Sequence, residues 1–273
     1  MKTMSTWIRK KGLILLLYLF LASCDWIEYH PYDIWKTTGT SDLNDSNISR
    51  IEQADDQQDT IRFAFIGDSQ RFYDETEAFV REVNKRDDID FVIHGGDITD
   101  FGMSKEYLWI NDIMKKLNVP YVALIGNHDV VGHGKIIYES IYGDLNFSFK
   151  FRNTRFICLN TNALEFDYST PVPDFDFMSG FLGDTAQVTR TVVVMHAPPF
   201  DVQFNNNSVQ TFNNILEGYN NLIFCLHAHL HKRAENDFFN NGIKYIGCDD
   251  MEGRNYLLIT IAGNSYSYEV VNF

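Results

Sequence analysis

Five apolar segments of this chain are each followed by polar residues of the kinds that hold divalent metals. The five junctions read Gly67-Asp68-Ser69-Gln70, Gly96-Asp97-Ile98-Thr99-Asp100, Gly126-Asn127-His128-Asp129, Met195-His196-Ala197-Pro198 and Leu226-His227-Ala228-His229. Each apolar segment has the length and composition of a buried strand. Ligands of open α/β sheets bind at the edge where the strands end, so the pattern predicts a metal site at that edge.

The order of the remaining segments predicts an α/β fold. Strands are expected at 61–66, 91–93 and 121–125, with helices over 73–86 and 104–117 between them, the second capped by Ser104. This β-α-β-α-β order requires parallel strands. Later strands are expected at 147–149, 155–160, 191–195, 222–226, 244–246, 256–261 and 266–271, the last two forming a hairpin. We therefore expect two mixed β-sheets packed as a sandwich and flanked by helices.

The N-terminus has the features of an export signal. A cationic start precedes a short apolar stretch from Leu13 to Leu21, which is too short to span a bilayer as a helix. The sequence Leu21-Ala22-Ser23-Cys24 follows and is similar to the lipobox of bacterial lipoproteins, in which the cysteine carries the lipid. We expect residues 1–23 to be removed and Cys24 to anchor the chain to the cell envelope, outside the cytoplasm. An ordinary signal peptide with an incidental cysteine is the alternative.

The net charge of the mature chain narrows the range of binding partners. Removal of residues 1–23 takes away four cationic residues and no acidic ones, which moves the formal net charge from −14 to −18. An acidic surface of this kind argues against binding to the phosphates of nucleic acid, and it leaves the lipid as the contact with the membrane.

Three cysteines remain besides Cys24, namely Cys158, Cys225 and Cys248, each in or beside an apolar run, and buried thiols are expected.

The mature chain is expected to have two parts. Residues 24–59 are polar and irregular in pattern and are interpreted as a lipid-anchored tether, with the aromatic segment Tyr29-His30-Pro31-Tyr32 packing on the main domain. Residues 60–273 have the length of one α/β domain.

From residue 61 to about residue 271 the chain resembles the calcineurin-like metallophosphoesterases. That family carries the motifs D-x-H, G-D, G-N-H-D/E, a lone His after a strand, and G-H-x-H, in this order. The resemblance implies a β-sandwich flanked by helices and a hydrolase with two divalent metals, which could be Mn, Fe or Zn. It also implies that one metal is held by Asp68, Gln70 and His229.

The same resemblance implies that Asn127, His196 and His227 hold the second metal, with Asp97 bridging the two. His128 would be the catalytic histidine, close to the phosphoryl group without being a metal ligand. Asp129 is expected to orient His128 or its loop. Arg71, beside the first motif, is a candidate for substrate binding.

Two residues depart from the family pattern. Gln70 stands where the family usually has His; its amide oxygen can bind a metal but is a harder and weaker donor than imidazole. Leu226 stands where a glycine usually precedes the histidine pair. This second departure leaves His229 and His231 as an alternative pair, although His227 and His229 are preferred because His227 directly ends the apolar strand.

The residue set suits hydrolysis of phosphate esters. Two metals neutralise the negative phosphoryl group, lower the pKa of a bridging water and hold the attacking and leaving oxygens in line. We expect an exported, membrane-anchored phosphoesterase whose substrate is a phosphorylated small molecule or an envelope component, with Phe166 to Phe181 as the specificity loop. A metal-binding surface lipoprotein with little turnover, and a pyrophosphatase or nucleotide-sugar hydrolase, are the alternatives.

Overall fold

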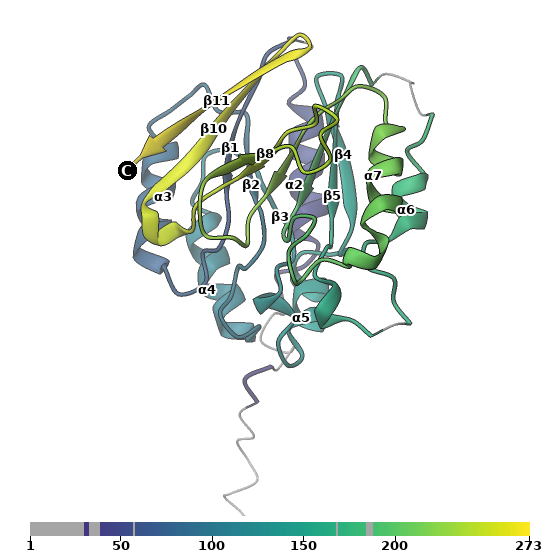
Figure 1. Cartoon of the computed structure of the whole chain (residues 1–273). Helices are drawn as coiled ribbons and strands as arrows, with labels where there is room; N and C mark the ends of the chain where they lie inside the picture. The colour runs from purple at the N-terminus through teal and green to yellow at the C-terminus, as the bar shows by residue number, and fades with distance from the viewer. Residues whose placement is uncertain (1–29, 33–38, 57, 168, 184–187) are drawn as a thin grey trace, which may run out of the picture.

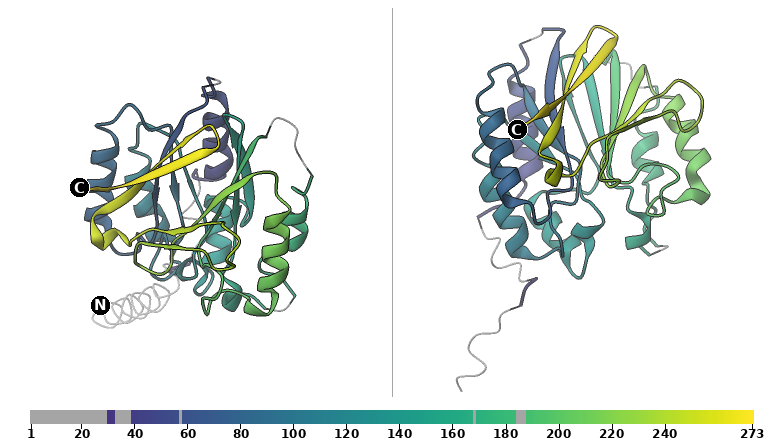
Figure 2. Two further views of the ribbon diagram at one scale, coloured as in Figure 1. Left: turned by 45° about the horizontal axis from the view of Figure 1, so that its top comes forward. Right: turned by 60° about the vertical axis from the view of Figure 1, so that its left-hand side comes forward.

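The computed structural model describes residues 30–32, 39–56, 58–167, 169–183 and 188–273. Two β-sheets pack face to face, and helices cover the outer face of each sheet (Figures 1 and 2). The predicted sandwich of two mixed sheets flanked by helices is therefore confirmed.

The first sheet contains the predicted parallel strands. Its order is β11 (Ser265–Asn272), β10 (Asn255–Ala262), β1 (Ile61–Ile66), β2 (Phe91–His94) and β3 (Tyr121–Ala123). Strands β1, β2 and β3 are parallel, whereas β10 runs antiparallel to β1 and to β11. The expected hairpin at the end of the chain thus extends this sheet at the β1 edge.

The second sheet is formed by the middle of the chain. Its order is β4 (Phe147–Phe151), β5 (Thr154–Leu159), β6 (Arg190–Met195), β7 (Leu222–His227), β9 (Tyr245–Gly247) and β8 (Ala234–Asn236). Strands β5, β6, β7 and β9 are parallel, and the two edge strands are antiparallel to their neighbours. The short strand β8 was not predicted, because its sequence Ala-Glu-Asn has no strand propensity.

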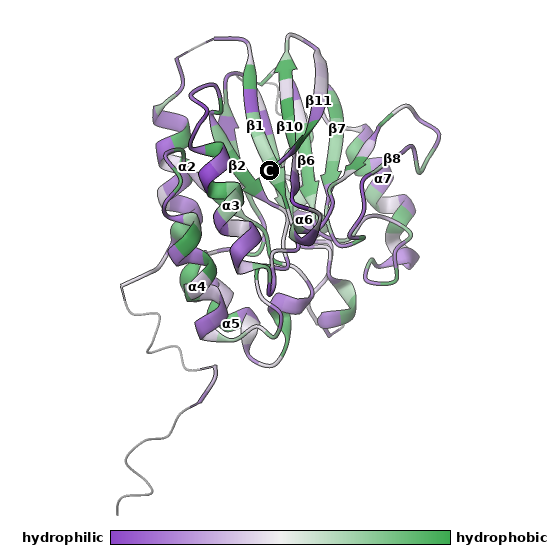
Figure 3. Cartoon of the chain, turned by 90° about the vertical axis from the view of Figure 1, so that its left-hand side faces the viewer, coloured by the Kyte–Doolittle hydropathy of each residue, from purple (hydrophilic) through white to green (hydrophobic). Residues whose placement is uncertain are grey.

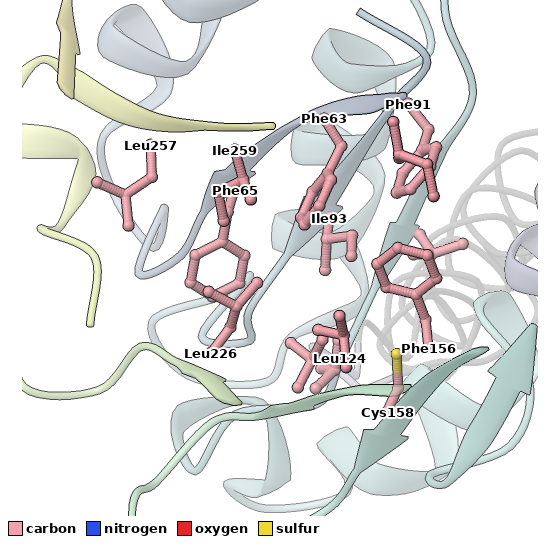
Figure 4. Close-up of a cluster of buried hydrophobic side chains, with 14 of the residues drawn as sticks. Phe63, Phe65, Phe91, Ile93, Leu124, Phe156, Cys158, Leu226, Leu257 and Ile259 are labelled. Carbon is pink, nitrogen blue, oxygen red and sulfur yellow. The ribbon is translucent and has the colours of Figure 1, made fainter. Parts of the chain in front are cut away.

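The main core lies between the two sheets (Figure 4). Phe63 of β1 stacks on Phe91 of β2 at a centroid distance of 5.2 Å and meets the edge of Phe156 of β5 at 5.4 Å. Leu226 and Cys158 complete this cluster from the second sheet. Cys158, Cys225 and Cys248 are buried free thiols, as expected. These aromatic contacts pack the first sheet against the second.

Amphipathic helices cover the sheets on the outside. Helices α3 (Tyr73–Val83), α4 (Ser104–Met114) and α5 (Gly134–Ile141) pack on the first sheet, and α6 (Phe175–Ser179) and α7 (Val209–Glu217) on the second. Figure 3 shows that hydrophilic and hydrophobic residues alternate along the helices, whereas the strands are largely hydrophobic. The part of the chain that the structure describes also contains four 3₁₀ turns: η3 (His128–Val130), η4 (Ala163–Glu165), η5 (Asn206–Ser208) and η6 (Met251–Gly253). The cap of α4 is Met103, one residue before the predicted Ser104, and its N–H donates to Glu106.

The expectation of an irregular tether is wrong for part of residues 24–59. Residues Leu43–Gln53 form helix α2, which packs beside β3 and β4. The carboxamide of Asn44 donates to the carbonyl of Ala123 and accepts from its N–H, both at 2.9 Å, and thereby continues the hydrogen bonding of the edge strand. Ile51 enters the core between the sheets. The polar composition concealed this helix, because its buried face consists largely of hydrogen-bonded asparagine.

The aromatic segment before α2 contacts the domain, as expected. Tyr32 donates its hydroxyl hydrogen bond to the carbonyl of Phe101 at 3.1 Å and packs against Gly132, while Ser104 donates its N–H to Pro31. Cys24 and the export signal lie outside the described residues. Among the residues with a described structure, none of the helices is long and apolar enough to cross a membrane.

Candidate metal centre

The carboxyl ends of strands from both sheets meet at one edge of the sandwich. Asp68, Asp97 and Asn127 follow β1, β2 and β3 of the first sheet, and His196 and His229 follow β6 and β7 of the second. Hydrogen bonds join the two sets: His196 Nδ1 lies 2.9 Å from the carbonyl oxygen of Gly95, and the His229 N–H donates to Asp68 Oδ2 at 3.1 Å. The structure therefore brings the predicted junctions together at one place.

Unusual backbone conformations aim these side chains. Asp68, Asp97, His229 and His231 all have left-handed φ values, at 52°, 55°, 67° and 50°. Such values are uncommon for residues other than glycine and cluster at functional sites, where surrounding contacts compensate for the strain. Gly96 has a φ of 101°, and a Cβ atom there would lie 2.7 Å from His196 Nδ1. The turn after β2 therefore needs glycine at this position to admit the histidine.

Two groups of side chains have the spacing needed to hold a metal ion. One consists of Asp97, His196 and His229, and the other of Asp68, Asp97 and His231; in each, the candidate ligand atoms lie within 4.8 Å of one another. Asp97 belongs to both groups, which agrees with the bridging role expected for it. The geometry thus offers two adjacent sites that share one carboxylate.

The structure places His227 differently from the other two histidines of this segment. His227 belongs to neither group, whereas His229 and His231 belong to one each. Strand β7 continues through His227, so this side chain lies on the same face as Cys225, which packs in the outer cluster against α6 and α7. The chain leaves the strand only afterwards, with left-handed residues at His229 and His231. The spacing of the candidate ligand atoms therefore favours the alternative pair, His229 and His231.

The two carboxamides also lie at the centre. Gln70 Nε2 lies 3.1 Å from Asp97 Oδ2, and the Gln70 N–H donates to the Asp97 carbonyl at 3.1 Å. Asn127 Oδ1 lies 3.0 Å from His196 Nε2. The Asn127 amide oxygen thus lies beside the group that contains His196, and the Gln70 carboxamide lies beside Asp97, which the two groups share.

The polar atoms fit divalent metals in two respects. Asp68 is buried, and in the part of the chain that the structure describes its Oδ1 has no hydrogen-bond partner; His231 Nε2 lies 3.4 Å from it. Each histidine of the two groups has one ring nitrogen held by an acceptor, as metal-binding histidines usually do. These acceptors are the carbonyl of Gly95 for His196, Asp201 for His229 and Asp250 for His231. Carboxylate, imidazole and amide donors together suit Mn, Fe or Zn.

The ion pair between Asp97 and His196 shows that this site stabilises positive charge. Burial alone would raise the pKa of Asp97, but the neighbouring His196, 3.3 Å away, holds it at about 2. Burial alone would lower the pKa of His196, and Asp97 instead raises it to about 9. The carboxylate of Asp97 therefore stays ionised and needs a cation beside it.

Asp129 fixes the loops that carry Asp97 and Asn127. Its buried carboxylate accepts hydrogen bonds from the N–H groups of Gly126 at 2.8 Å, Ile98 at 3.1 Å and Thr99 at 2.8 Å. It holds the loop of His128, one of the two roles expected for it, and it does not touch the His128 side chain in any described contact. Burial raises the pKa of Asp129 to about 7, and the negative charge of Asp97 adds to the effect.

His128 stands at the open side of the centre. Its side chain is 39% exposed, and its Nδ1 lies 2.9 Å from the carbonyl oxygen of Asp100. A carbonyl only accepts, so Nδ1 carries a proton and Nε2 is left to face a substrate. Arg71 Nη2 donates to Asp100 Oδ1 at 2.6 Å and is itself 62% exposed. Arg71 and His128 thus flank the same carboxylate.

Two acidic residues of the site were missed in the sequence. Asp201 Oδ1 lies 3.0 Å from His229 Nε2, and Asp250 Oδ2 lies 3.3 Å from His231 Nδ1. Neither directly ends a predicted strand, and an isolated Asp in a loop carries no distinctive sequence signal. His94 is buried with its Nε2 2.8 Å from Ser69 Oγ, and it makes none of the contacts that define the two groups.

Solved structures with the same fold include three proteins of comparable similarity. GAP50, the anchor in the inner membrane complex of Plasmodium, matches with a TM-score of 0.59 and 13% identity over 79% of this chain and 85% of its own. A dimetal phosphatase from Danio rerio matches with a TM-score of 0.59 and 12% identity over 78% and 99%. The purple acid phosphatase PPD1 from yellow lupin (Lupinus luteus) seeds matches with a TM-score of 0.58 and 12% identity over 79% and 52%. At these identities the likeness shows the fold alone.

Sequence comparison identifies the family. Among curated proteins nothing matches the chain. The sequence pattern of the calcineurin-like phosphoesterases, in contrast, matches residues 61–233, which is more than half of the chain and contains both ligand groups. The chain therefore belongs to the calcineurin-like phosphoesterase family and is a binuclear metallophosphoesterase, a hydrolase of phosphoric esters that uses two divalent metal ions.

Proposed function

We propose that this enzyme hydrolyses phosphate esters at the edge built around Asp97, and that it does so outside the cytoplasm. The observation that carries the proposal is the membership of Asp97 in both ligand groups. Two metals bound there would neutralise the phosphoryl charge and supply a water of lowered pKa.

The ligand assignment follows the two groups. Asp68, Asp97 and His231 would hold one metal, with the Gln70 amide oxygen beside them. Asp97, His196 and His229 would hold the other, with the Asn127 oxygen beside them. The hydrogen bonds of the outer ring nitrogens support this assignment, because they leave the remaining nitrogen of each histidine toward the centre.

His128 would serve the leaving group. Hydrolysis forms a bond between phosphorus and the oxygen of water, breaks the ester P–O bond and delivers a proton to the leaving oxygen. In its protonated form His128 can donate that proton from Nε2, since Nδ1 is held by Asp100. Arg71, which donates to the side chain of the same Asp100, would pair with a non-bridging phosphate oxygen.

Export and lipid anchoring are the second part of the proposal. The cationic start, the short apolar stretch and the lipobox-like Leu21-Ala22-Ser23-Cys24 support them. The lipid on Cys24 would hold the enzyme at the surface of a membrane of the cell envelope, with a substrate that is a phosphorylated small molecule or an envelope component.

A non-catalytic anchor or binding role is the competing function. Gln70 in the place of the usual His supports it, because an amide oxygen binds metals more weakly than imidazole. The similar fold of GAP50, the anchor in the inner membrane complex of Plasmodium, is compatible with it.

Metal content and turnover of the full chain distinguish the two functions. The lipid-modified protein, reconstituted with Mn, Zn or Fe, is assayed against an aryl phosphate monoester, a bis-aryl diester and pyrophosphate. We expect two metals per chain and turnover of at least one ester. Two bound metals without any turnover would support the binding role, and preferential cleavage of pyrophosphate would identify a pyrophosphatase.

A further inference from the structure

The chain enters the catalytic domain beside the metal centre. Pro31 and Tyr32 are docked on the loops that follow β2 and β3, through the carbonyl of Phe101 and the backbone of Gly132. These are the loops that carry Asp97 and His128. In Figure 1 this short purple segment lies at the same end of the molecule as α5. The N-terminal attachment is therefore at the catalytic edge.

The length of chain before this contact limits how far the site can be from a lipid on Cys24. Six residue steps separate Cys24 from His30. A fully extended chain covers at most about 3.3–3.6 Å per residue, so the span is no more than about 20 Å. A lipid-anchored enzyme with Tyr32 docked at this edge must therefore keep its catalytic edge close to the bilayer.

The same edge carries exposed apolar side chains. The described residues include eight large hydrophobic side chains that are exposed, and five of them follow the carboxyl ends of β2, β3, β5 and β6: Phe101, Val131, Leu164, Phe200 and Val202. Val202 and Leu164 are the most exposed, at 74% and 66%. Single exposed apolar residues are ordinary, but a concentration around a functional site marks a surface that contacts something apolar. We call these five residues the apolar rim.

A cavity with both apolar and polar lining residues is linked to the metal centre through Asp201. It has a volume of about 670 Å³ and lies between the loops after β5 and β6, with Leu164, Phe166, Val172 and Phe204 among its lining residues. Asn206, which also lines it, donates to the carbonyl of Asp201, whose carboxylate contacts His229. A volume of this size accommodates a sizeable organic group.

From these observations we propose that the apolar rim docks on the lipid bilayer and that the substrate is an amphiphilic phosphate ester of that bilayer. The proposal rests on the hydrolase function and the lipid anchor proposed above. The phosphate of such a lipid reaches the metals while its apolar portion occupies the cavity and the rim. Because the mature chain is strongly acidic, the docking depends on apolar contact and not on attraction to anionic lipid. The tether raises the effective concentration of a substrate in the same membrane.

The test uses the full lipid-modified chain in phosphatidylcholine vesicles. Three substrates are compared: dioleoyl phosphatidic acid in the same vesicles, the water-soluble dihexanoyl analogue, and an aryl phosphate. The first variant has a 20-residue Gly/Ser segment inserted after Cys24, which adds about 25 Å of average reach. The second is the double variant L164S/V202S. Its matched control is Leu182→Ser, an exposed apolar residue that precedes β6 and lies away from the catalytic edge.

We expect wild type to prefer the embedded substrate over its short-chain analogue. The insertion and L164S/V202S should each lower kcat/KM for the embedded substrate by about tenfold, as expected when the apolar contact with lipid is lost. Turnover of the aryl phosphate should stay unchanged in the insertion variant, and Leu182→Ser should behave as wild type on all three substrates. Equal rates on both lipids, unaffected by either variant, would overturn the docking proposal while leaving the hydrolase intact. Failure of the hydrolase function itself is recognised separately, as absence of turnover on all three substrates.

Discussion

Asp201 Oδ1 lies 3.0 Å from His229 Nε2, although the two residues follow different strands of the second sheet. A carboxylate on the outer nitrogen of a metal-binding histidine fixes the ring and raises its basicity, and loss of such a partner usually costs 10–100-fold in metal affinity. We expect Asp201→Ala to weaken binding of one of the two metals by about 10–100-fold. Titration calorimetry with Mn or Zn measures this directly. Asp112→Ala, an exposed carboxylate on α4, is the control and should bind both metals normally.

The two possible histidine pairs give different metal contents. If His229 and His231 are the ligands, His231→Ala should retain about one metal per chain, because it removes a member of the Asp68 group. His227→Ala should keep two metals, although the loss of a buried side chain should reduce stability. Elemental analysis after reconstitution and gel filtration counts the metals. One metal in His227→Ala together with two in His231→Ala would restore the pair preferred from the sequence.

His128 separates catalysis from metal binding. Its exposed ring contacts the Asp100 carbonyl, and it belongs to neither ligand group. His128→Asn should lower kcat by about 10²–10⁴-fold, the usual contribution of general acid catalysis, with both metals retained. Asp97→Ala should instead lose metal and activity together. Unchanged turnover in His128→Asn would contradict the role proposed for the histidine.

Asp129 should contribute to stability more than any exposed carboxylate. Its removal leaves the N–H groups of Gly126, Ile98 and Thr99 without their buried acceptor. Asp129→Ala should lower the free energy of unfolding by about 3–5 kcal/mol, since each unsatisfied buried donor costs about 1–3 kcal/mol. Urea unfolding in the presence of EDTA measures this effect without a contribution from bound metal. Asp112→Ala should stay within about 0.5 kcal/mol of wild type.

Cys24 should carry the lipid. In a bacterial host, labelled fatty acid should enter the wild-type protein, and Cys24→Ala should abolish both the label and the membrane association of the chain. Membrane fractionation and fluorography are sufficient readouts. A Cys24→Ala protein that remained labelled and membrane-bound would place the anchor elsewhere.

The local sequence determined most of the fold. Arg190–Met195 is buried along its whole length and Ile61–Ile66 is buried except at Arg62, and a largely apolar run of that length is typical of a strand covered on both faces. The polar residues after five such runs indicated the edge of the site, because parallel strands present their carboxyl ends together. Helix α2 could not be predicted from the local sequence. Its buried Asn44 is stabilised by a hydrogen bond to the backbone of Ala123, 79 residues away in the sequence.

Only the tertiary structure decided which histidines face the centre. Three histidines alternate at 227, 229 and 231, and sequence alone cannot locate the residue at which the chain leaves the strand. Pairing of His227 with Met195 and Gly247 keeps it in β7, and the left-handed turns then direct His229 and His231 toward Asp97 and Asp68. The hydrogen-bond partners of these histidines, Asp201 and Asp250, could not be predicted from the sequence either, because their positions depend on how loops from separate strands pack. Strand formation follows from side-chain pattern, whereas the direction of a side chain at a strand end depends on contacts distant in sequence.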